Sequence, residues 1–219
     1  WANYFIGIWV ETNNAKKYKI YTEIMMVDRS LFNSKRYSLS LGNRYRFNNK
    51  FSINHNLNIS PQTDNVGFAA ISGNDVIFGR RDIKSVENLL NLKYSFNDKM
   101  NINTRIRHYW SKVDYKEFFT LLQDGGLEKN NSFNQNVNQN YNAFNIDAVF
   151  TWQYAPGSFI NLVWKNAAYD FNRIVNQGYF KNFNNTMQAD DNNNLSLKVI
   201  YFLDYLQLKK LKKKNPDKK

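Results

Sequence analysis

Residues 142–166 read NAFNIDAVFTWQYAPGSFINLVWKN. From Phe144 to Tyr154 large apolar residues occupy almost every second position, and the residues between them are mostly polar. This alternation is typical of a β-strand with one apolar and one polar face. Ala155 to Ser158 interrupt it with Pro and Gly, which favour a tight turn. Because alternation resumes from Ile160 to Trp164, the stretch predicts a β-hairpin.

The length of these runs favours a strand that crosses a membrane. About ten residues at roughly 3.3 Å each, tilted near 45°, rise about 23 Å, close to the apolar band of an outer-membrane barrel. Aromatic residues make up 16% of the chain while the mean hydropathy is −0.64, which suits strands that face lipid on one side and water on the other. No apolar run is long enough for a transmembrane helix.

Charge and residue usage exclude several other classes of protein. The chain has no Cys, which removes disulfide scaffolds, thiolate metal sites and cysteine nucleophiles. Of the net charge of +12, the Lys-rich tail 209–219 contributes +6, from seven Lys and one Asp. The aromatic residues follow the strand period instead of interleaving with a basic face, so we expect no nucleic-acid partner. We expect no metal and no cofactor, because no motif for either is present.

The same alternation along the chain predicts nine long strands, and thus an all-β, antiparallel, up-and-down transmembrane β-barrel or part of one. The expected strands are 1–11, 18–26, 37–47, 51–59, 86–96, 100–110, 144–154, 160–164 and 195–205. The expected short turns are Thr12 to Lys16, Asn48 to Lys50, Asn97 to Lys99 and Pro156 to Ser158. The expected longer, polar connections are 28–35, 61–81 (with short strands in VGFAAIS and DVIFG), 117–140 and 171–193.

A repeat supports this division of the chain. YRFNNKFSIN at residues 45–54 and YSFNDKMNIN at residues 94–103 each place a tight turn beside an aromatic residue. Since outer-membrane barrels have short periplasmic turns and long extracellular loops, we expect the C-terminus in the periplasm. The first strand would then run towards the periplasm, so at least one further strand and a signal segment are expected before Trp1. We expect residues 1–208 to form the barrel segment and 209–219 a disordered periplasmic tail that could contact anionic lipid or peptidoglycan.

Two groups of side chains are candidates for a functional role. Charged residues on the polar faces are interspersed acids and bases, which favours a lumen-facing ion-pair ladder over an anion-attracting lumen; they are Arg44, Arg46, Glu87, Lys93, Arg105, Arg107, Asp147, Lys165, Lys198 and Asp204. Aromatic residues near the short turns are expected at the membrane interface; they are Tyr45, Phe47, Phe51, Tyr94, Phe96, Trp152 and Tyr154. The two histidines, His55 and His108, lie on outward rows and are expected to be structural.

Several strings in the chain carry a resemblance: FGRRD at residues 78–82, RHYWSKV at 107–113, WQYAPGS at 152–158 and FLDYL at 202–206. Over most of residues 37–210 the chain resembles the C-terminal part of a Bacteroidota family of large outer-membrane proteins of unassigned function. The N-terminal part of that family looks like a family-9 carbohydrate-binding module. The resemblance implies an outer-membrane barrel with a sugar-binding-like domain upstream, and it carries over no catalytic residues.

We therefore expect a non-enzymatic outer-membrane barrel that acts as a pore, a scaffold or an accessory subunit of an envelope complex. Expected partners are outer-membrane lipid, other envelope proteins and, at the extracellular loops, glycan. Two alternatives stay open. One is a soluble antiparallel β-sandwich that binds carbohydrate, although Ser, Asn and Arg on the second face of several strands disfavour a two-sheet core. The other is a membrane-embedded barrel enzyme, for which the sequence offers no clear cluster of acid, base and nucleophile.

Overall fold

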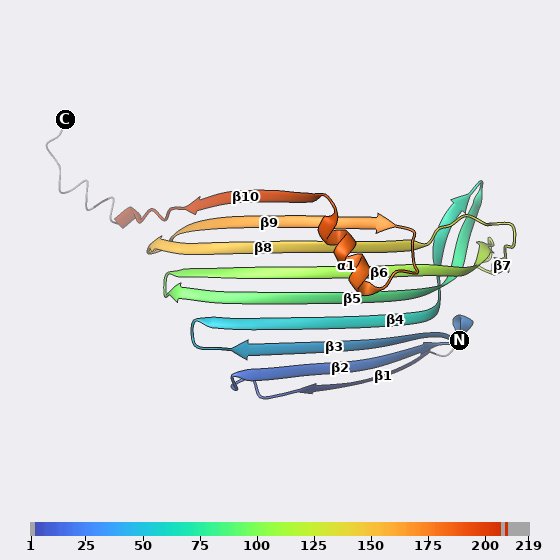
Figure 1. The fold of residues 1–219 in the computed structure, drawn as a ribbon, viewed down its shortest axis with the longest axis horizontal. Helices are drawn as coiled ribbons and strands as arrows, with labels where there is room; N and C mark the ends of the chain where they lie inside the picture. The colour runs from blue at the N-terminus through green and yellow to red at the C-terminus, as the bar shows by residue number, and fades with distance from the viewer. Residues whose placement is uncertain (1–2, 207–208, 210–219) are drawn as a thin grey trace.

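The chain forms a single antiparallel sheet in the computed structural model, which describes residues 3–206 and 209 (Figure 1). Nine long strands lie side by side in chain order, and the tenth, β7, pairs only with β6. The strands are β1 (Asn3–Glu11), β2 (Tyr18–Arg29), β3 (Ser34–Arg46), β4 (Phe51–Ser72), β5 (Asp75–Asn97), β6 (Met100–Leu121), β7 (Leu127–Lys129), β8 (Gln139–Ala155), β9 (Ser158–Asn172) and β10 (Asp191–Ile200). An all-β, up-and-down antiparallel sheet is thus confirmed. Over the described residues β1 and β10 do not pair, so the sheet is open.

The register places the alternating residues of neighbouring strands on the same face. Leu39 of β3 lies opposite Ile24 of β2 and Ile59 of β4, and Leu162 of β9 lies opposite Phe150 of β8. The apolar rows predicted for the separate strands therefore join into one face that runs from β1 to β10. A one-residue slip in any pair would turn the apolar row of that strand to the other side.

All four predicted short turns are present at one end of the sheet, and the strands predicted in VGFAAIS and DVIFG are present too, but the segment 61–81 that contains them is not a separate connection. β4 and β5 continue through it and meet at Gly73, which has a φ of +62°. Register shifts between Gln62 and Asn65 and between Phe68 and Ala70 interrupt the strand period. Because a β-bulge adds a residue to one strand, the alternation changes phase there and the sequence no longer reads as a single strand.

The other long connections are also shorter than predicted. Half of residues 28–35 belong to β2 and β3, with one 3-10 turn (Leu31–Asn33) between the two strands. In the segment 117–140, β6 continues to Leu121, β7 follows, and β8 begins at Gln139. The segment 171–193 contains a helix that we did not predict, α1 (Tyr179–Gln188).

The last strand ends earlier than predicted, at Ile200 instead of Tyr205. Ile200 pairs with Phe159, next to the first residue of β9, so the backbone beyond Ile200 has no strand to pair with. Asp204 therefore lies outside the sheet. In the predicted tail 209–219, all residues except Lys209 lie outside the described part of the chain.

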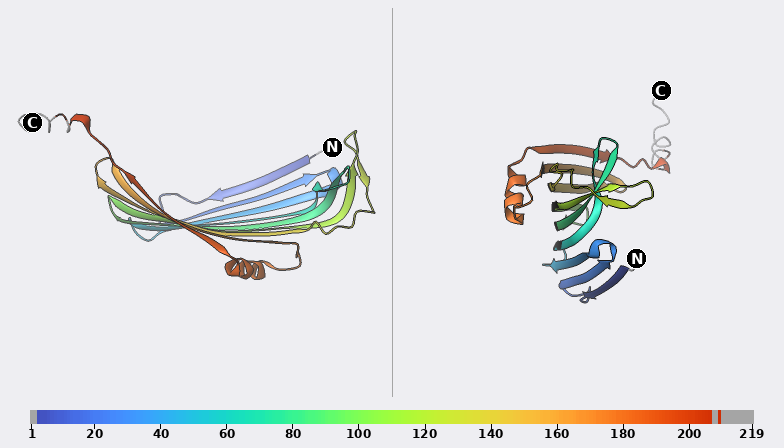
Figure 2. Two further views of the ribbon diagram at one scale, coloured as in Figure 1. Left: turned by 90° about the horizontal axis from the view of Figure 1, so that it is seen from above. Right: turned by 90° about the vertical axis from the view of Figure 1, so that its right-hand side faces the viewer.

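The sheet is curved, and α1 lies against its convex side (Figure 2). The residues that α1 contacts, such as His108 and Trp110, belong to the apolar rows, so the convex face is the apolar one. At the other end of the strands from the short turns, β4 to β6 extend beyond their neighbours and bend towards the concave side (Figure 2). In the described part of the chain no helix is both long and apolar enough to cross a membrane.

Candidate functional site

A row of aromatic side chains crosses the apolar face next to the short turns. Successive ring centroids lie 4.7–6.3 Å apart, mostly edge to face, from β2 to β8. The members, in spatial order, are Tyr18, Tyr45, Phe47, Phe51, Tyr94, Phe96 and Phe150. This row, called here the aromatic ladder, contains five of the seven residues predicted for the interface. The remaining two, Trp152 and Tyr154, contact each other at 6.1 Å on β8.

A second aromatic cluster lies farther along the same face, around α1. Tyr179 and Phe183 of the helix pack against His108, with ring centroids 5.1 and 4.9 Å away. Trp110 contacts Tyr179 at 5.9 Å, and Phe144 contacts Phe183 at 6.3 Å. Aromatic side chains thus lie at two levels of the apolar face, from β2 to β8 next to the short turns and on β6, β8 and α1 farther along.

A buried network of amides fixes α1 to the sheet. Asn182 accepts hydrogen bonds through Oδ1 from Asn140 Nδ2 at 2.6 Å and Asn142 Nδ2 at 3.3 Å. Its own Nδ2 donates to the Gly178 carbonyl at 2.8 Å, and Trp110 Nε1 donates to Asn140 Oδ1 at 2.8 Å. All these side chains are buried. Because buried polar groups are costly unless they are paired, the network specifies where the helix lies.

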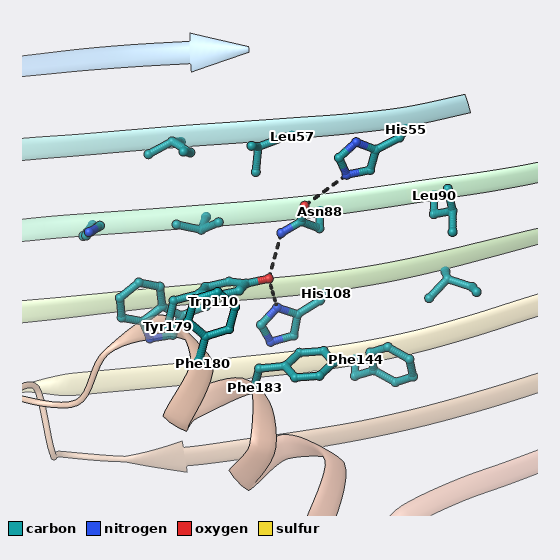
Figure 3. Close-up of a pocket in the computed structure, with 14 residues that line it drawn as sticks. His55, Leu57, Asn88, Leu90, His108, Trp110, Phe144, Tyr179, Phe180 and Phe183 are labelled. Carbon is teal, nitrogen blue, oxygen red and sulfur yellow. Dashed lines mark hydrogen bonds between the residues drawn. The ribbon is translucent and has the colours of Figure 1, made fainter. Parts of the chain in front are cut away.

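A cavity of about 770 Å³ opens between α1 and strands β4, β5, β6 and β8 (Figure 3). Most of its lining is aliphatic or aromatic, and the polar exceptions lie in its middle and at one end. The lining residues are His55, Leu57, Ile59, Lys84, Val86, Asn88, Leu90, Ile106, His108, Trp110, Phe144, Tyr179, Phe180 and Phe183. The volume lies in the range of roughly 300–1,000 Å³ that is usual for ligand pockets.

A chain of hydrogen bonds crosses this cavity from β4 to β6 (Figure 3). His55 Nε2 lies 3.1 Å from Asn88 Oδ1, and Asn88 Nδ2 donates to Tyr179 Oη at 2.7 Å. Tyr179 Oη lies 2.8 Å from His108 Nδ1. The Tyr179 hydroxyl accepts from Asn88 and shares a second hydrogen bond with His108 Nδ1, so it links strands β5 and β6 through the helix. Both predicted outward histidines therefore belong to one site.

The charged residues predicted for the lumen lie mainly on the concave, polar face, but few of them pair with each other. Arg107 Nε lies 2.6 Å from Glu87 Oε1, and Lys165 Nζ lies 4.0 Å from Asp147 Oδ1. Arg44 and Arg46 of β3 instead donate to backbone carbonyls of the β1–β2 turn. Arg44 Nη2 donates to the Asn14 carbonyl at 2.7 Å, and Arg46 Nη2 donates to the Ala15 carbonyl at 2.5 Å.

The remaining predicted charges are spread over the sheet. Lys93 and Arg105 line a mainly polar pocket of about 590 Å³ together with Asp147 and Lys165. Lys198 lies opposite Asn161, at the β10 edge. Asp204 is not part of a ladder, because it follows the end of β10 and accepts a hydrogen bond from the Leu206 backbone N–H at 2.9 Å.

The FGRRD string belongs to an ionic cluster on the extended hairpins, which the sequence analysis did not anticipate. Arg80 lies 3.1 Å from Asp64 and 3.1 Å from Glu117. Lys116 Nζ lies 2.5 Å from Asp82 Oδ2, and this hydrogen bond raises the pKa of Lys116 above its ordinary value. The cluster ties β4, β5 and β6 together where all three extend past their neighbours.

The fold and this site define an antiparallel β-sheet protein whose sheet has one apolar and one polar face, with a helix docked on the apolar face. The sequence of residues 1–212 matches a family described as a domain of unknown function, DUF5916, and the chain belongs to that family. No curated protein sequence matches the chain.

Proposed function

We propose that the sheet is part of the wall of an outer-membrane β-barrel, with its convex face towards lipid and its concave face towards the lumen. One observation carries this proposal: a single apolar face crosses nine strands, with an aromatic row from β2 to β8 next to the short turns and a second aromatic cluster on β6, β8 and α1. Interfacial aromatic belts on both sides of an apolar band are the usual pattern of such barrels.

The distance between the two aromatic zones supports this proposal. From Phe96 in the aromatic ladder to Val86, which pairs with Trp110, β5 runs about ten residues. At roughly 3.3 Å per residue and a tilt near 45°, that distance corresponds to about 23 Å of height, against about 25 Å for the apolar band of a barrel. The helix α1 would then lie at the upper limit of the band, where its exposed polar residues could reach water.

Exposure of the apolar face argues against the soluble β-sandwich. Ile24, Leu195 and Leu197 are 54%, 69% and 65% exposed, although they belong to strands that should face a core in a sandwich. Within the described part of the chain only α1 covers this face, and it covers a small part of it. A water-soluble protein rarely leaves an apolar surface of this extent uncovered.

Within this proposal the protein is a non-enzymatic barrel component that serves as a pore, a scaffold or a subunit of an envelope assembly. The excess of Arg and Lys over Asp and Glu on the concave face would favour anionic solutes or partners if the lumen is open. Glycan contact at the long-loop end remains part of the proposal, with the extended hairpins of β4 to β6 as the surface available for it.

Two neighbouring substitutions on β3 test the membrane assignment. Leu41→Arg places a charge on the apolar face, and Ser40→Arg places the same charge on the polar face, opposite Glu23. In lipid vesicles, an arginine near the middle of the lipid-facing band costs about 2–4 kcal/mol. We therefore expect urea titration to show that Leu41→Arg lowers the free energy of unfolding by about that amount relative to Ser40→Arg. Equal stabilities, or a monodisperse protein in buffer without detergent, would overturn the proposal.

A further inference from the structure

The concave face carries a cluster of four hydrogen-bond donors near the short turns. Lys93 of β5 lies directly opposite Asn103 of β6, and Asn91 of β5 lies directly opposite Arg105 of β6. Residues two apart on one strand share a face, so the four side chains form a square on one side of the sheet. The diagonal pair, Lys93 and Arg105, is about 7–8 Å apart. These four residues, called here the donor square, all line the pocket of about 590 Å³ on this face.

The two cations of the donor square have no acceptor among the described residues. Neither Lys93 nor Arg105 forms an ion pair or a side-chain hydrogen bond with a described residue. Asp147 of β8 lies directly opposite Arg105, but its carboxylate lies 4.0 Å from Lys165 Nζ and forms no ion pair with Arg105. Like charges on neighbouring positions of one face repel each other, so an anion over the square would relieve this repulsion.

The other predicted lumen arginines differ from Arg105, because each already has an acceptor in the protein. Arg107 Nε lies 2.6 Å from Glu87 Oε1, and Arg44 and Arg46 donate to carbonyls of the β1–β2 turn. A guanidinium that binds protein oxygens has fewer N–H groups left for a ligand. The donor square therefore combines unpaired positive charge with amide donors, and these three arginines do not.

The chemistry of the donor square fits a phosphate group. Its two positive charges match the charge of a phosphate dianion. Asn91 forms no side-chain hydrogen bond with a described residue, and Asn103 Nδ2 uses one of its two N–H groups, towards Asn101 Oδ1 at 2.9 Å. A phosphate monoester offers three acceptor oxygens, and the guanidinium of Arg binds two of them with parallel N–H groups. A carboxylate, with one charge and two oxygens, would leave part of the square unpaired.

We propose that the donor square binds a phosphate dianion, either free or as the monoester of a solute. Arg105 and Lys93 bind its oxygens from two corners of the square, and Asn91 and Asn103 donate to it from the other two. This inference deepens the preference for anions that is part of the proposed function, and it assigns that preference to particular residues. The donor square depends only on the pairing of β5 with β6, so phosphate binding does not require the sheet to close into a barrel.

Phosphate binding can be measured directly on the full chain in detergent micelles. Inorganic phosphate is titrated at neutral pH and constant ionic strength, and the broadening of its phosphorus NMR line reports the bound fraction. Lys93→Gln and Arg105→Gln should each weaken binding by about three- to tenfold, because each removes a charge-assisted hydrogen bond. Asp147→Asn should strengthen binding by about twofold, because it removes the negative charge opposite Arg105. A variant that fails to fold would not bind phosphate more tightly.

Lys198→Gln is the matched control, since it removes the same charge from the same face at the β10 edge. Three strand spacings of about 4.8 Å separate β10 from β6, which is more than the Debye length of about 8 Å at physiological salt. We therefore expect this variant to change binding by less than about twofold. Equal weakening by all three Gln variants, or no weakening by Lys93→Gln and Arg105→Gln, overturns the donor square as a site.

Competition identifies the class of anion. Glycerol phosphate should displace inorganic phosphate from the donor square, and acetate at the same concentration should not. Displacement by acetate as effective as that by glycerol phosphate overturns the assignment to phosphate, whereas failure of glycerol phosphate alone restricts the site to the free ion. The membrane assignment is tested separately by Leu41→Arg against Ser40→Arg. Phosphate binding that depends on Lys93 and Arg105, together with equal stabilities of those two β3 variants, would overturn the membrane assignment and keep the donor square.

Discussion

Replacing Asn182 by Ala should release α1 from the sheet. The side chain of Asn182 is fully buried and accepts the hydrogen bonds of Asn140 and Asn142. Asn140 Nδ2 keeps a second partner, Asn172 Oδ1 at 3.0 Å, whereas Asn142 Nδ2 has no other partner among the described residues. In Asn182→Ala the buried Nδ2 of Asn142 is therefore left without a hydrogen-bond partner for as long as the helix stays docked.

The structure sets the size of this effect. An unpaired buried polar group costs about 1–3 kcal/mol, and the loss of the remaining bonds adds about 1 kcal/mol, so docking should weaken by about 2–4 kcal/mol. A helix of ten residues is not stable in isolation, so the loss should appear as undocking and unfolding of α1 alone. Hydrogen exchange of the amides in residues 179–188 should then accelerate by about 30- to 1,000-fold.

Asn184→Ala is the matched control. Asn184 is on the same helix, is exposed, and forms no side-chain hydrogen bond with a described residue. Hydrogen–deuterium exchange measured by mass spectrometry on the reconstituted chain should show rates within about threefold of the parent for this variant, since surface substitutions usually change stability by less than about 0.5 kcal/mol. Equal acceleration in the two variants, or none in Asn182→Ala, would refute the account of how α1 is held.

Two further predictions concern the extended hairpins. In Gly79→Ala the new Cβ would lie 2.3 Å from Tyr115 Cδ1, so urea titration should show a loss of about 1–3 kcal/mol, whereas Gly7→Ala, whose nearest atom is 3.6 Å away, should be nearly neutral. Asp82→Asn should lower the pKa of Lys116 towards its ordinary 10.5, as measured by NMR titration of the lysine. Because the pKa of Lys116 is raised in the folded chain, the contribution of this pair to stability is complete below pH 10.5 and is lost as the pH rises through the folded pKa. Asp82→Asn should remove this loss of stability at alkaline pH. An unchanged titration of Lys116 in the variant would contradict the pairing.

The strands and short turns were predictable because both depend on local sequence. Alternation has a period of two residues whatever the partner strand is. The repeated Asn at the turns acts through its own side chain: Asn48 Oδ1 accepts from the Lys50 N–H at 2.8 Å, and Asn97 Oδ1 from the Lys99 N–H at 2.9 Å. Such Asx turns require no distant contact, so the sequence alone placed them correctly.

The features that were missed depend on contacts between distant segments. The bulge beside Asp64, whose φ is +51°, is held by a hydrogen bond from its own N–H to Asp82, 18 residues away. Helix α1 lies in an Asn-rich segment that reads as a loop, because the positions it buries, Asn182 and Thr186, are polar. The spacing of four residues between Asn182 and Thr186, and between Tyr179 and Phe183, is a helical signal. Six of the ten helix residues are polar, and this composition hides the signal in the sequence.

Polar interruptions in otherwise apolar rows were the sequence signal for the site. His55, Asn88 and His108 each interrupt an apolar row of their own strand, and Asn142 directly precedes such a row, so in each strand alone the residue reads as a tolerated exception. The register brings them together, because Asn88 lies opposite His108, and Asn142 lies opposite Trp110. A polar group on a lipid-facing row is costly unless something covers and pairs with it. The convergence of several such groups therefore indicates that this part of the face is covered, as it is by α1.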